Sequence, residues 1–471
     1  MIGVLNNLRD YLVKSNRESV TGRLDILVCS SNVSKTPVIM ELKVLPTYKN
    51  MESTCDMAIR QIEEKAYDSS LPEEGYTEVL FYGIAFYLTH RIKKAILTLT
   101  LMERKSIMNR TVFGVVDGEK EVSLFTLKNR NGMEITVSDL GAVLTRVIVP
   151  AQEGQPRDVV LGYGSANEYR KNTSTYFGST IGRNGNRLEG AAVTLEGKVF
   201  CMTPNEGKNN LHSGPDGYQI RLWNVKEPAE GRNEVTFVLE SPDGDQGFPG
   251  NLELSVTYAL TEDNEICITY KGVSDAETVF NPTNHSYFNL NGHDSGTILN
   301  HVLTLMADFY TPVRDSASIP TGETADVTGT PMDFRQGKAI GAEIDADYEQ
   351  LQFTGGYDHN FVISQSAGSG SRMGLSRAAV VTSPESGISM EVETDRPGVQ
   401  LYAGNFLNEE PGKDGVKYGK RCGFCLETQY FPNAANEPAF ESPIINANEP
   451  CVTKTVYRFK SQGLKQGGED R

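Results

Sequence analysis

The stretch VSLFTLKNRNGMEITVSDLGAVLTRVIVP, residues 122–150, decides the class of fold. Apolar and polar residues alternate on either side of the segment NRNG at 129–132. A side-chain period of two is typical of a β-strand that buries one face, and Asn and Gly are favoured in the turns between strands. The stretch therefore predicts antiparallel strands that share a core-facing side.

The same pattern recurs along most of the chain. Alternating runs with Gly, Asn, Asp or Pro turns occupy residues 232–241, 251–275, 388–404 and 455–460. From residue 111 onward helical periodicity is almost absent, and about 360 residues of short strands exceed a simple β-sandwich. We therefore expect a large architecture of stacked antiparallel sheets.

Residues 1–105 follow a different pattern. Leu5, Leu8, Leu12 and Val13 recur at helical spacing and predict a helix up to about residue 15. Further predicted elements are strands at 22–30, 36–45 and 78–88 and an amphipathic helix at 55–71. This part of the chain is predicted to be a small α/β unit.

Length and charge both predict two domains. A chain of 471 residues exceeds the size of most single cores. Residues 1–105 contain 14 Lys+Arg and 13 Asp+Glu, a net charge of +1, whereas the remainder contains 31 against 48, a net charge of −17. We therefore predict one domain over 1–105 and a second over 106–471.

Several classes of protein are disfavoured by composition. A formal net charge of −16 repels phosphate groups, so we expect neither a general nucleic-acid binder nor an anionic-membrane binder. Arg9 and Asp10 interrupt the apolar core that a signal peptide needs, and the chain contains no run of 18 apolar residues. Seven scattered cysteines do not form a disulfide framework. We expect a soluble cytoplasmic protein.

Three charged residues interrupt the predicted strands of the first unit. Asp25 lies inside an apolar run, and Glu41 and Lys43 are two positions apart, hence on one face of the next strand. Two carboxylates and a lysine can hold a divalent cation and stabilise a phosphoryl transition state. An ion pair on a solvent-facing surface is the alternative.

The order GRLDI, VIMELK, AIRQIEEKAY and YGIAF over residues 1–100 resembles the PD-(D/E)XK nuclease superfamily, in the form appended to bacterial AAA-ATPase-like proteins. The resemblance implies that Asp25, Glu41 and Lys43 occupy the metal-site positions and that Gln61 is the glutamine of the following helix. An active site of this kind needs a divalent metal. Such appended modules are often truncated or inactive, and a net charge of +1 does not attract DNA.

Six motifs place polar groups within the β-rich unit. They are IGRNGNRLEG with Arg183, Asn186 and Arg187, NNLHSG with His212, NPTNHSYFNLNG with His285 and Tyr287 on one strand face, GYDHNFV with Asp358 and His359, RPGVQLYAGN with Gln400, and FCLETQYFPNA with Glu427. Singly, the loop histidine, the aspartate and the glutamine each have structural explanations as turn or hydrogen-bonding residues. A phosphate-binding loop at 181–190 is disfavoured because no helical pattern follows it. Glu427 is different, since burying an unpaired carboxylate costs several kcal/mol or more.

The six motifs, in this order, resemble the aldose 1-epimerase family, also called galactose mutarotases, over about residues 111–460. The resemblance implies an all-β antiparallel supersandwich and acid/base interconversion of the α and β anomers of free aldohexoses, with Glu427 as general base and His285 as general acid. It further implies that the sugar is bound by Asn186, Arg187, His212, Tyr287, Asp358 and Gln400, whereas Arg183 either binds sugar or braces its loop. His359 and His293 are interpreted as structural. Neither a cofactor nor a catalytic metal is expected, and we predict a monomer.

Departures from the family pattern are small: Gly185 stands where Ala is common and Ser213 where Gly is frequent. The pair CGFC at 422–425 is compatible with a metal or redox site, but residues three apart on a strand point to opposite faces, so two packed thiols are favoured. Carboxylate clusters are compatible with a structural Ca²⁺ ion, although none has calcium-loop spacing.

Three alternatives stay open: a carbohydrate-binding or sensing protein, a metal-dependent nuclease with an appended sugar-binding domain, and an inert fusion at the N-terminus. The preferred aldose is left open too.

Overall fold

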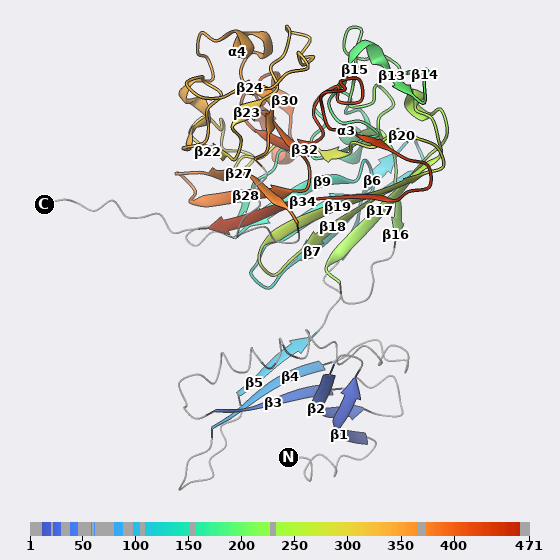
Figure 1. Ribbon diagram of the computed structural model, residues 1–471. Helices are drawn as coiled ribbons and strands as arrows, with labels where there is room; N and C mark the ends of the chain where they lie inside the picture. The colour runs from blue at the N-terminus through green and yellow to red at the C-terminus, as the bar shows by residue number, and fades with distance from the viewer. Residues whose placement is uncertain are drawn as a thin grey trace, which may run out of the picture. The chain divides into compact units, whose positions relative to one another are not determined.

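A computed structural model of the protein divides into two compact units, Met1–Ser106 and Ile107–Arg471. The structure describes residues 109–150, 156–226, 232–364 and 374–461, together with five strands and positions 58 and 61 of the first unit. Figure 1 draws the described elements along the chain.

The first unit contains one five-stranded sheet in the order β1-β2-β3-β4-β5. Its strands are β1 Leu12–Ser19, β2 Gly22–Cys29, β3 Val38–Leu45, β4 Leu80–Tyr87 and β5 Thr98–Glu103. β3 and β4 are parallel, and the other neighbours are antiparallel. The strands predicted at 22–30, 36–45 and 78–88 are confirmed.

The helix predicted up to residue 15 is wrong at its end. Leu12 and Val13 begin β1 and pair with Cys29 and Val28 of β2. Pairing with a neighbouring apolar strand outweighs the local helical spacing here, because helix propensity is a weak preference that tertiary contacts override. Residues 1–11, and all of the helix predicted at 55–71 except positions 58 and 61, lie outside the described residues.

The second unit is built on a nine-stranded antiparallel sheet (Figure 1) in the order β16-β17-β18-β19-β34-β28-β27-β22-β25. Its strands are β16 Asn224–Lys226, β17 Glu234–Ser241, β18 Leu252–Leu260, β19 Glu265–Ser274, β34 Cys451–Ser461, β28 Ile388–Thr394, β27 Ser376–Thr382, β22 Val302–Leu305 and β25 Lys338–Ala339. This sheet contains the strands predicted at 232–241, 251–275 and 455–460 and the first part of the stretch at 388–404.

Two five-stranded sheets complete the frame. One is β10 Arg157–Asp158, β9 Val143–Val149, β8 Glu134–Ser138, β7 Lys120–Lys128 and β6 Asn109–Val116; the other is β24 Ala325–Asp326, β23 Phe309–Tyr310, β26 Asp358–Val362, β29 Gly398–Tyr402 and β32 Cys425–Gln429. Short pairs are β11 Thr180–Ile181 with β21 Thr283–Asn284, β12 Arg187–Leu188 with β15 Asn210–Leu211, β13 Ala192–Leu195 with β14 Lys198–Cys201, β20 Thr278–Val279 with β33 Ile444–Ile445, and β30 Glu410–Pro411 with β31 Lys417–Tyr418.

Alternation of side chains creates one large core between the sheets. Along β18 the residues at every second position are buried, as the period-two pattern predicted. Phe125 of β7 and Phe237 of β17 meet in this core, with ring centroids 5.6 Å apart. The turn 129–132 is closed by a bond from the Met133 amide to the Asn129 side chain of 2.9 Å. The predicted antiparallel supersandwich is confirmed.

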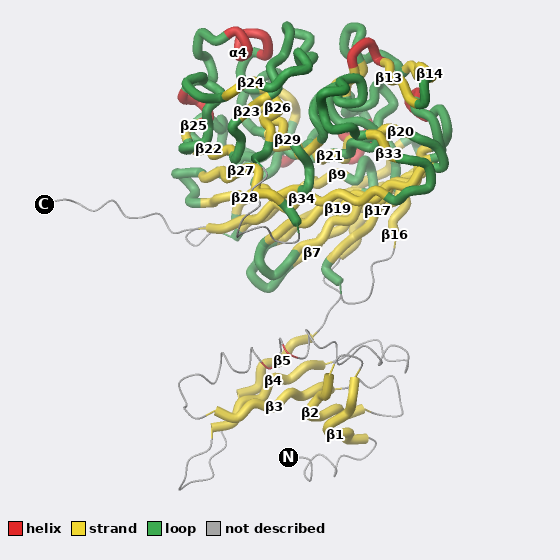
Figure 2. Tube along the Cα trace, in the orientation of Figure 1, coloured by secondary structure: helices red, strands yellow, loops and turns green. Residues whose placement is uncertain are grey.

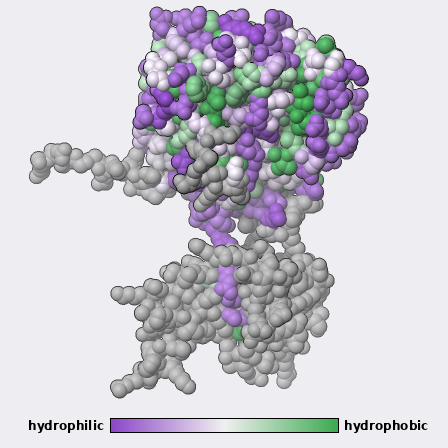
Figure 3. Space-filling view, viewed as in Figure 1, coloured by the Kyte–Doolittle hydropathy of each residue, from purple (hydrophilic) through white to green (hydrophobic). Residues whose placement is uncertain are grey.

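Helices are short in the described part of this unit: α3 spans Ala166–Arg170 and α4 spans Glu349–Thr354. Figure 2 shows that strands and loops make up almost all of it. On the face drawn in Figure 3, hydrophilic residues surround smaller hydrophobic patches. None of the described helices has both the length and the apolar character needed to cross a membrane.

Candidate active site

Three neighbouring strands, β26, β29 and β32, form the floor of the candidate site. Their antiparallel register places Gln400 directly opposite Asn360 on one side and Glu427 on the other. Directly opposed side chains share one face of a sheet, and residues two apart on a strand return to it. This face carries Asp358, Asn360, Gln400, Tyr402, Cys425, Glu427 and Gln429. The prediction that Cys425, Glu427 and Gln429 share a face is confirmed.

The opposite face of these strands is apolar and packs into the core. Leu401 and Leu426 are buried and belong to the main hydrophobic cluster. The Tyr457 hydroxyl of β34 donates to the Leu426 carbonyl at 3.1 Å, which attaches β32 to the nine-stranded sheet. Because its neighbour Leu426 faces the core, Glu427 must face the other way, toward the polar row. This accounts for a carboxylate in an otherwise apolar strand.

His285 and Tyr287 stand beside this floor. The single strand predicted across NPTNHSYFNLNG is wrong, since β21 ends before His285. The backbone of His285 instead bonds with two loop residues, accepting from the Gly178 amide at 3.0 Å and donating to the Ser179 carbonyl at 2.9 Å. The two rings still lie on one side, with centroids 5.1 Å apart, as predicted.

The Glu427 carboxylate and the His285 imidazole form the centre of the site. Glu427 Oε1 lies 3.6 Å from His285 Nε2, and both side chains are buried. Burial, reinforced by the charge of Asp358 and opposed by Arg187, raises the pKa of Glu427 well above its usual value. Burial lowers the pKa of His285 to about 4. Both shifts favour uncharged groups, so the acidic proton of the pair lies on Glu427 and His285 is a neutral imidazole.

Cys425 contacts the other nitrogen of His285. Its Sγ lies 3.7 Å from His285 Nδ1. Burial, together with the nearby carboxylates of Glu427 and Asp358, raises the pKa of the thiol well above its usual value, so it keeps its proton. A thiol beside an imidazole nitrogen donates to it, which favours the tautomer of neutral His285 that carries its proton on Nε2, the nitrogen facing Glu427.

His212 forms a wall of the site beside His285. It follows β15 and lies with its ring edge-on to that of His285, at 5.1 Å between centroids. The Asn186 amide donates to His212 Nδ1 at 3.1 Å. Burial, with the repulsion that Arg187 and a protonated His285 exert on an imidazolium, lowers the pKa of His212 well below its usual value. A neutral ring that accepts at Nδ1 presents an Nε2–H donor to the site.

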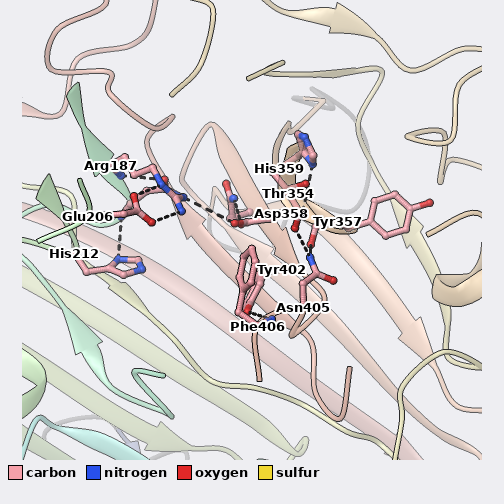
Figure 4. Close-up of polar contacts among 12 residues, drawn as sticks. Arg187, Glu206, His212, Thr354, Tyr357, Asp358, His359, Tyr402, Asn405 and Phe406 are labelled. Carbon is pink, nitrogen blue, oxygen red and sulfur yellow. Dashed lines mark hydrogen bonds and ion pairs between the residues drawn. The ribbon is translucent and has the colours of Figure 1, made fainter. Parts of the chain in front are cut away.

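Arg187 connects this wall with the sheet floor. Its guanidinium makes two bonds to Glu206, of 2.7 and 2.8 Å, and lies 3.9 Å from Asp358. Figure 4 shows Arg187 between these two carboxylates. Asp358 also accepts from Gln400 Nε2 at 2.6 Å. The structure thus joins Arg187, Asp358 and Gln400 by an ion pair and a hydrogen bond next to Glu427, a set of donors and acceptors suited to a polyol.

Arg183 has a different environment. Its guanidinium is almost fully buried and all its N–H groups find partners within the protein, among them the carbonyls of Ser241, Pro249 and Gly250 at 2.7–2.9 Å. No donor is left for a ligand. This geometry favours the loop-bracing interpretation of Arg183.

Three residues of the site escaped the sequence reasoning. Glu206 lies in a loop whose composition gave no signal. Tyr176, also in a loop, places its ring 4.7 Å from that of His212 and 5.6 Å from that of His285. Asn360 is buried, and its side-chain amide has no hydrogen-bond partner among the described residues. Only Asn360 had a usable signal, because it lies two residues after Asp358 on the same strand.

The two other singled-out histidines are structural in their surroundings. His359 points away from the polar face, since it directly opposes Leu401, and burial lowers its pKa to about 3. His293 Nδ1 lies 2.9 Å from the Tyr418 hydroxyl. Cys422 is a half-buried free thiol and Cys425 a buried one.

The site also contains a set of metal-ligand types. The ligating atoms of His212, His285 and Glu427 lie within 4.8 Å of one another, the one such group among the described residues. Two imidazoles and a carboxylate suit a divalent metal such as zinc. The acid/base interpretation instead needs Glu427 and His285 free to exchange protons, so the prediction of no catalytic metal stays a prediction.

In the first unit, the predicted nuclease-like residues occupy neighbouring strands. Ile26 opposes Met40, so the register places Asp25 beside Glu41. Glu41 is buried and accepts a hydrogen bond from Gln61 Nε2. Lys43 lies in β3, two residues after Glu41, and its side chain is outside the described residues. Asp25 and Glu41 therefore occupy neighbouring positions on adjacent strands, and their role in a nuclease-like site stays a prediction.

Comparison with known proteins identifies the family. The family profile described as aldose 1-epimerase matches residues 123–458, and the profile of the PD-(D/E)XK nuclease superfamily matches residues 1–95. The chain belongs to the aldose 1-epimerase family.

Among curated proteins, the aldose 1-epimerase of Escherichia coli K12 is 37% identical over 355 residues, covering 75% of this chain and 99% of that protein. The galactose mutarotase of Sus scrofa is 37% identical over 354 residues, covering 75% and 98%. Among solved structures, an aldose epimerase homologue from C. elegans has a TM-score of 0.65 at 30% identity, covering 72% of this chain and 99% of that one. The galactose 1-epimerase of Lactobacillus acidophilus NCFM has a TM-score of 0.65 at 28% identity, covering 75% and 98%.

Proposed function

We propose that this protein is an aldose 1-epimerase that interconverts the α and β anomers of free aldohexoses such as glucose and galactose. The observation that carries the proposal is the pair of Glu427, on the polar sheet face, and His285 beside that face, both buried and 3.6 Å apart. Family membership and relatives that are named aldose 1-epimerase and galactose mutarotase support it.

Ring opening requires one proton to leave the anomeric hydroxyl and one to reach the ring oxygen. In our proposal Glu427 takes the first proton as the C1 to ring-oxygen bond breaks, and His285 Nε2 delivers the second. The C1–C2 bond then rotates, and the reverse transfers close the ring on the other aldehyde face. No net proton is consumed, and neither a redox cofactor nor a covalent intermediate is needed.

The electrostatics of the pair support this exchange. The reactive form, a carboxylate on Glu427 and an imidazolium on His285, contains the same number of protons as the neutral pair that burial favours. Burial raises the pKa of Glu427 toward the working pH. A general base is most effective when its pKa lies near that pH. Since both directions of the reaction use the same two groups, a pair that shares one proton suits the chemistry.

The surrounding polar groups are proposed to hold the sugar hydroxyls. Arg187 and Gln400 are held by carboxylate partners, and His212 presents an Nε2–H. Asn186, Tyr287 and Asp358 complete the proposed set. Arg183 is left out because its donors are engaged.

The test is the decay of optical rotation of freshly dissolved α-galactose or α-glucose. We expect the purified protein to accelerate this decay. We expect His285→Asn to lower the catalysed rate by a factor of about 10² to 10⁴. Full activity in His285→Asn would contradict the role of His285. Sugar binding by the wild type without faster mutarotation would favour a carbohydrate-binding or sensing protein instead.

Three further proposals come from the sequence. We propose that residues 1–105 act as a separate domain, that the protein is a monomer, and that it is cytoplasmic. Sedimentation velocity of the full chain tests the second, and fractionation of cells that express it tests the third.

A further inference from the structure

Glu206 holds the guanidinium of Arg187 through a two-pronged contact. Its Oε2 accepts from Arg187 Nε at 2.7 Å, and its Oε1 accepts from Arg187 Nη2 at 2.8 Å. Two parallel bonds of this kind fix both the position and the plane of a guanidinium. The Arg187 side chain is only 10% exposed and that of Glu206 is 36% exposed, so a half-buried carboxylate sets the orientation of a buried cation.

Backbone and side-chain hydrogen bonds fix Glu206 beside Arg187. The Glu206 amide donates to the Asn209 carbonyl at 3.2 Å, and the Asn209 amide donates to the Glu206 carbonyl at 3.0 Å. The Asn205 side chain donates to the Leu211 carbonyl at 3.0 Å and accepts from the Leu211 amide at 2.7 Å. Leu211 of β15 directly opposes Arg187 of β12. The turn that carries Glu206 is therefore fastened to the strand that carries Arg187.

The third nitrogen of the Arg187 guanidinium stays available for a ligand. Nη1 has no hydrogen-bond partner among the described residues, and it lies 3.9 Å from Asp358 Oδ2, which is too far for a hydrogen bond. Asp358 uses its other oxygen, which accepts from Gln400 Nε2 at 2.6 Å. Because a hydroxyl group both donates and accepts, one sugar hydroxyl can bind to Nη1 and Oδ2 together.

Two carboxylates compete for the same cation. Burial disfavours the charge of Arg187, but the charges of Asp358 and Glu206 outweigh burial and raise the pKa of Arg187. Figure 4 shows the guanidinium between these two carboxylates. Attraction between opposite charges is strong in a partly buried site. An Arg187 side chain released by Glu206 would therefore close on Asp358, and the resulting ion pair would occupy both atoms that a sugar hydroxyl needs.

We propose that Glu206 is a positioning residue that holds Arg187 apart from Asp358, so that Arg187 Nη1 and Asp358 Oδ2 stay open to one hydroxyl of the substrate. This inference rests on the proposed function. It adds a residue that acts through Arg187 rather than on the reacting atoms.

Glu206→Gln and Glu206→Asp separate the charge of this side chain from its shape. Gln keeps the shape but turns an amide N–H toward a donor of Arg187, whereas Asp keeps the charge and both acceptor oxygens on a shorter chain. Hydrogen bonds to charged groups correspond to a factor of roughly 10 to 100 in binding.

The experiment measures KM and kcat for galactose and glucose by polarimetry and the affinity for both sugars by isothermal titration calorimetry, using the full chain. We expect Glu206→Gln to raise KM by roughly 10 to 100 with kcat little changed, because a bond to a hydroxyl remote from the reaction stabilises ground and transition states alike. The calorimetric affinity should fall by the same factor. Glu206→Asp is expected to raise KM less than Glu206→Gln does.

Glu189→Gln is the matched control. Glu189 is 33% exposed, similar to Glu206, and its ion-pair partner is Arg314, at 2.7 Å. This substitution should leave KM, kcat and the calorimetric affinity unchanged.

Unchanged KM and sugar affinity in Glu206→Gln would overturn the positioning role. A larger loss in Glu206→Asp than in Glu206→Gln would overturn it too, since that order would mean that packing rather than charge is needed. A wild-type protein that binds either sugar without faster mutarotation would overturn the proposed function alone, because the calorimetric comparison would still decide the role of Glu206. A wild-type protein that neither binds nor converts these sugars would overturn both.

Discussion

Replacing Glu427 by Gln tests the centre of the site most directly. The two side chains have nearly the same shape, and Glu427 is only 2% exposed, so the substitution changes charge and basicity with little change in packing. Glu427 Oε2 has no hydrogen-bond partner among the described residues, so the amide breaks no bond there. The variant is expected to have both a lower mutarotation rate and a more stable fold than the wild type.

The loss of rate follows from the loss of the base. Gln cannot accept the anomeric proton, and general acid–base assistance typically contributes about 10² to 10⁴ in rate. At 1.36 kcal/mol per factor of ten, this range corresponds to about 3–5 kcal/mol of transition-state stabilisation. The affinity for the sugar should change much less than the rate, since an amide still hydrogen-bonds to a hydroxyl.

The gain in stability follows from the raised pKa of Glu427. The folded protein keeps a proton on Glu427 at pH values where the unfolded chain, with a pKa near 4.5, has released it. Stability therefore falls as pH rises from about 4.5 up to the folded pKa and is constant above it. The total loss is about 1.4 kcal/mol for each pH unit that separates the folded and unfolded pKa values. Glu427→Gln removes this loss, so its advantage should be absent at pH 4 and grow toward pH 8.

Polarimetry measures the rate, and thermal unfolding at pH 4, 6 and 8 measures the stability. For a unit as large as Ile107–Arg471, each kcal/mol corresponds to a change in Tm of roughly 1 °C. Glu391→Gln is the matched control. Three neighbouring cations, Arg377, Lys460 and Arg458, outweigh the effect of burial and lower the pKa of Glu391. This substitution should leave the rate unchanged and lower the Tm at pH 8.

Two results would refute the reasoning. Full activity in Glu427→Gln would remove Glu427 from the mechanism. A Tm at pH 8 that falls as much as in Glu391→Gln would show that the Glu427 carboxylate is stabilised by partners rather than destabilised by burial.

Other expectations concern charge, structure and metal. Asp358→Asn removes a charge that raises the pKa of Glu427. The alkaline limb of the pH–rate profile, where the Glu427–His285 pair loses its acidic proton, should therefore move to lower pH. An unmoved limb would contradict the coupling between Asp358 and Glu427. Arg183→Met should lower the free energy of unfolding by about 3 kcal/mol or more, because several buried carbonyls lose a charged donor, with the KM for galactose unchanged in steady-state assays. Dialysis against EDTA should leave the mutarotation rate unchanged, and a loss restored by Zn²⁺ would assign a metal to the site. Asp25→Ala should leave it unchanged too, and a large loss would reveal coupling between the two units.

The sequence determined the class of fold and which residues make up most of the candidate site. Alternation in 122–150 and its recurrence along the chain could be interpreted without tertiary information, because the period of a strand is a local property. The same local rule placed Cys425, Glu427 and Gln429 on one face. Local patterns failed at Leu12 and Val13, where strand pairing replaced the helix that their spacing predicted. They also failed at His285, which was predicted to lie in a strand but whose backbone pairs with a loop.

Tertiary structure decided what each polar residue of the site does. Arg183 and Arg187 are the same residue type, four positions apart in one turn, and the sequence alone left open whether Arg183 binds sugar as Arg187 was expected to. Arg183 is enclosed by carbonyls from 241–250, and Arg187 meets Glu206 and Asp358. The partners of both arginines lie far along the chain, and only the folding of distant loops onto the sheets brings them together. The pKa values of Glu427 and His285 belong to the same category, because burial and the approach of Asp358 are properties of the folded chain.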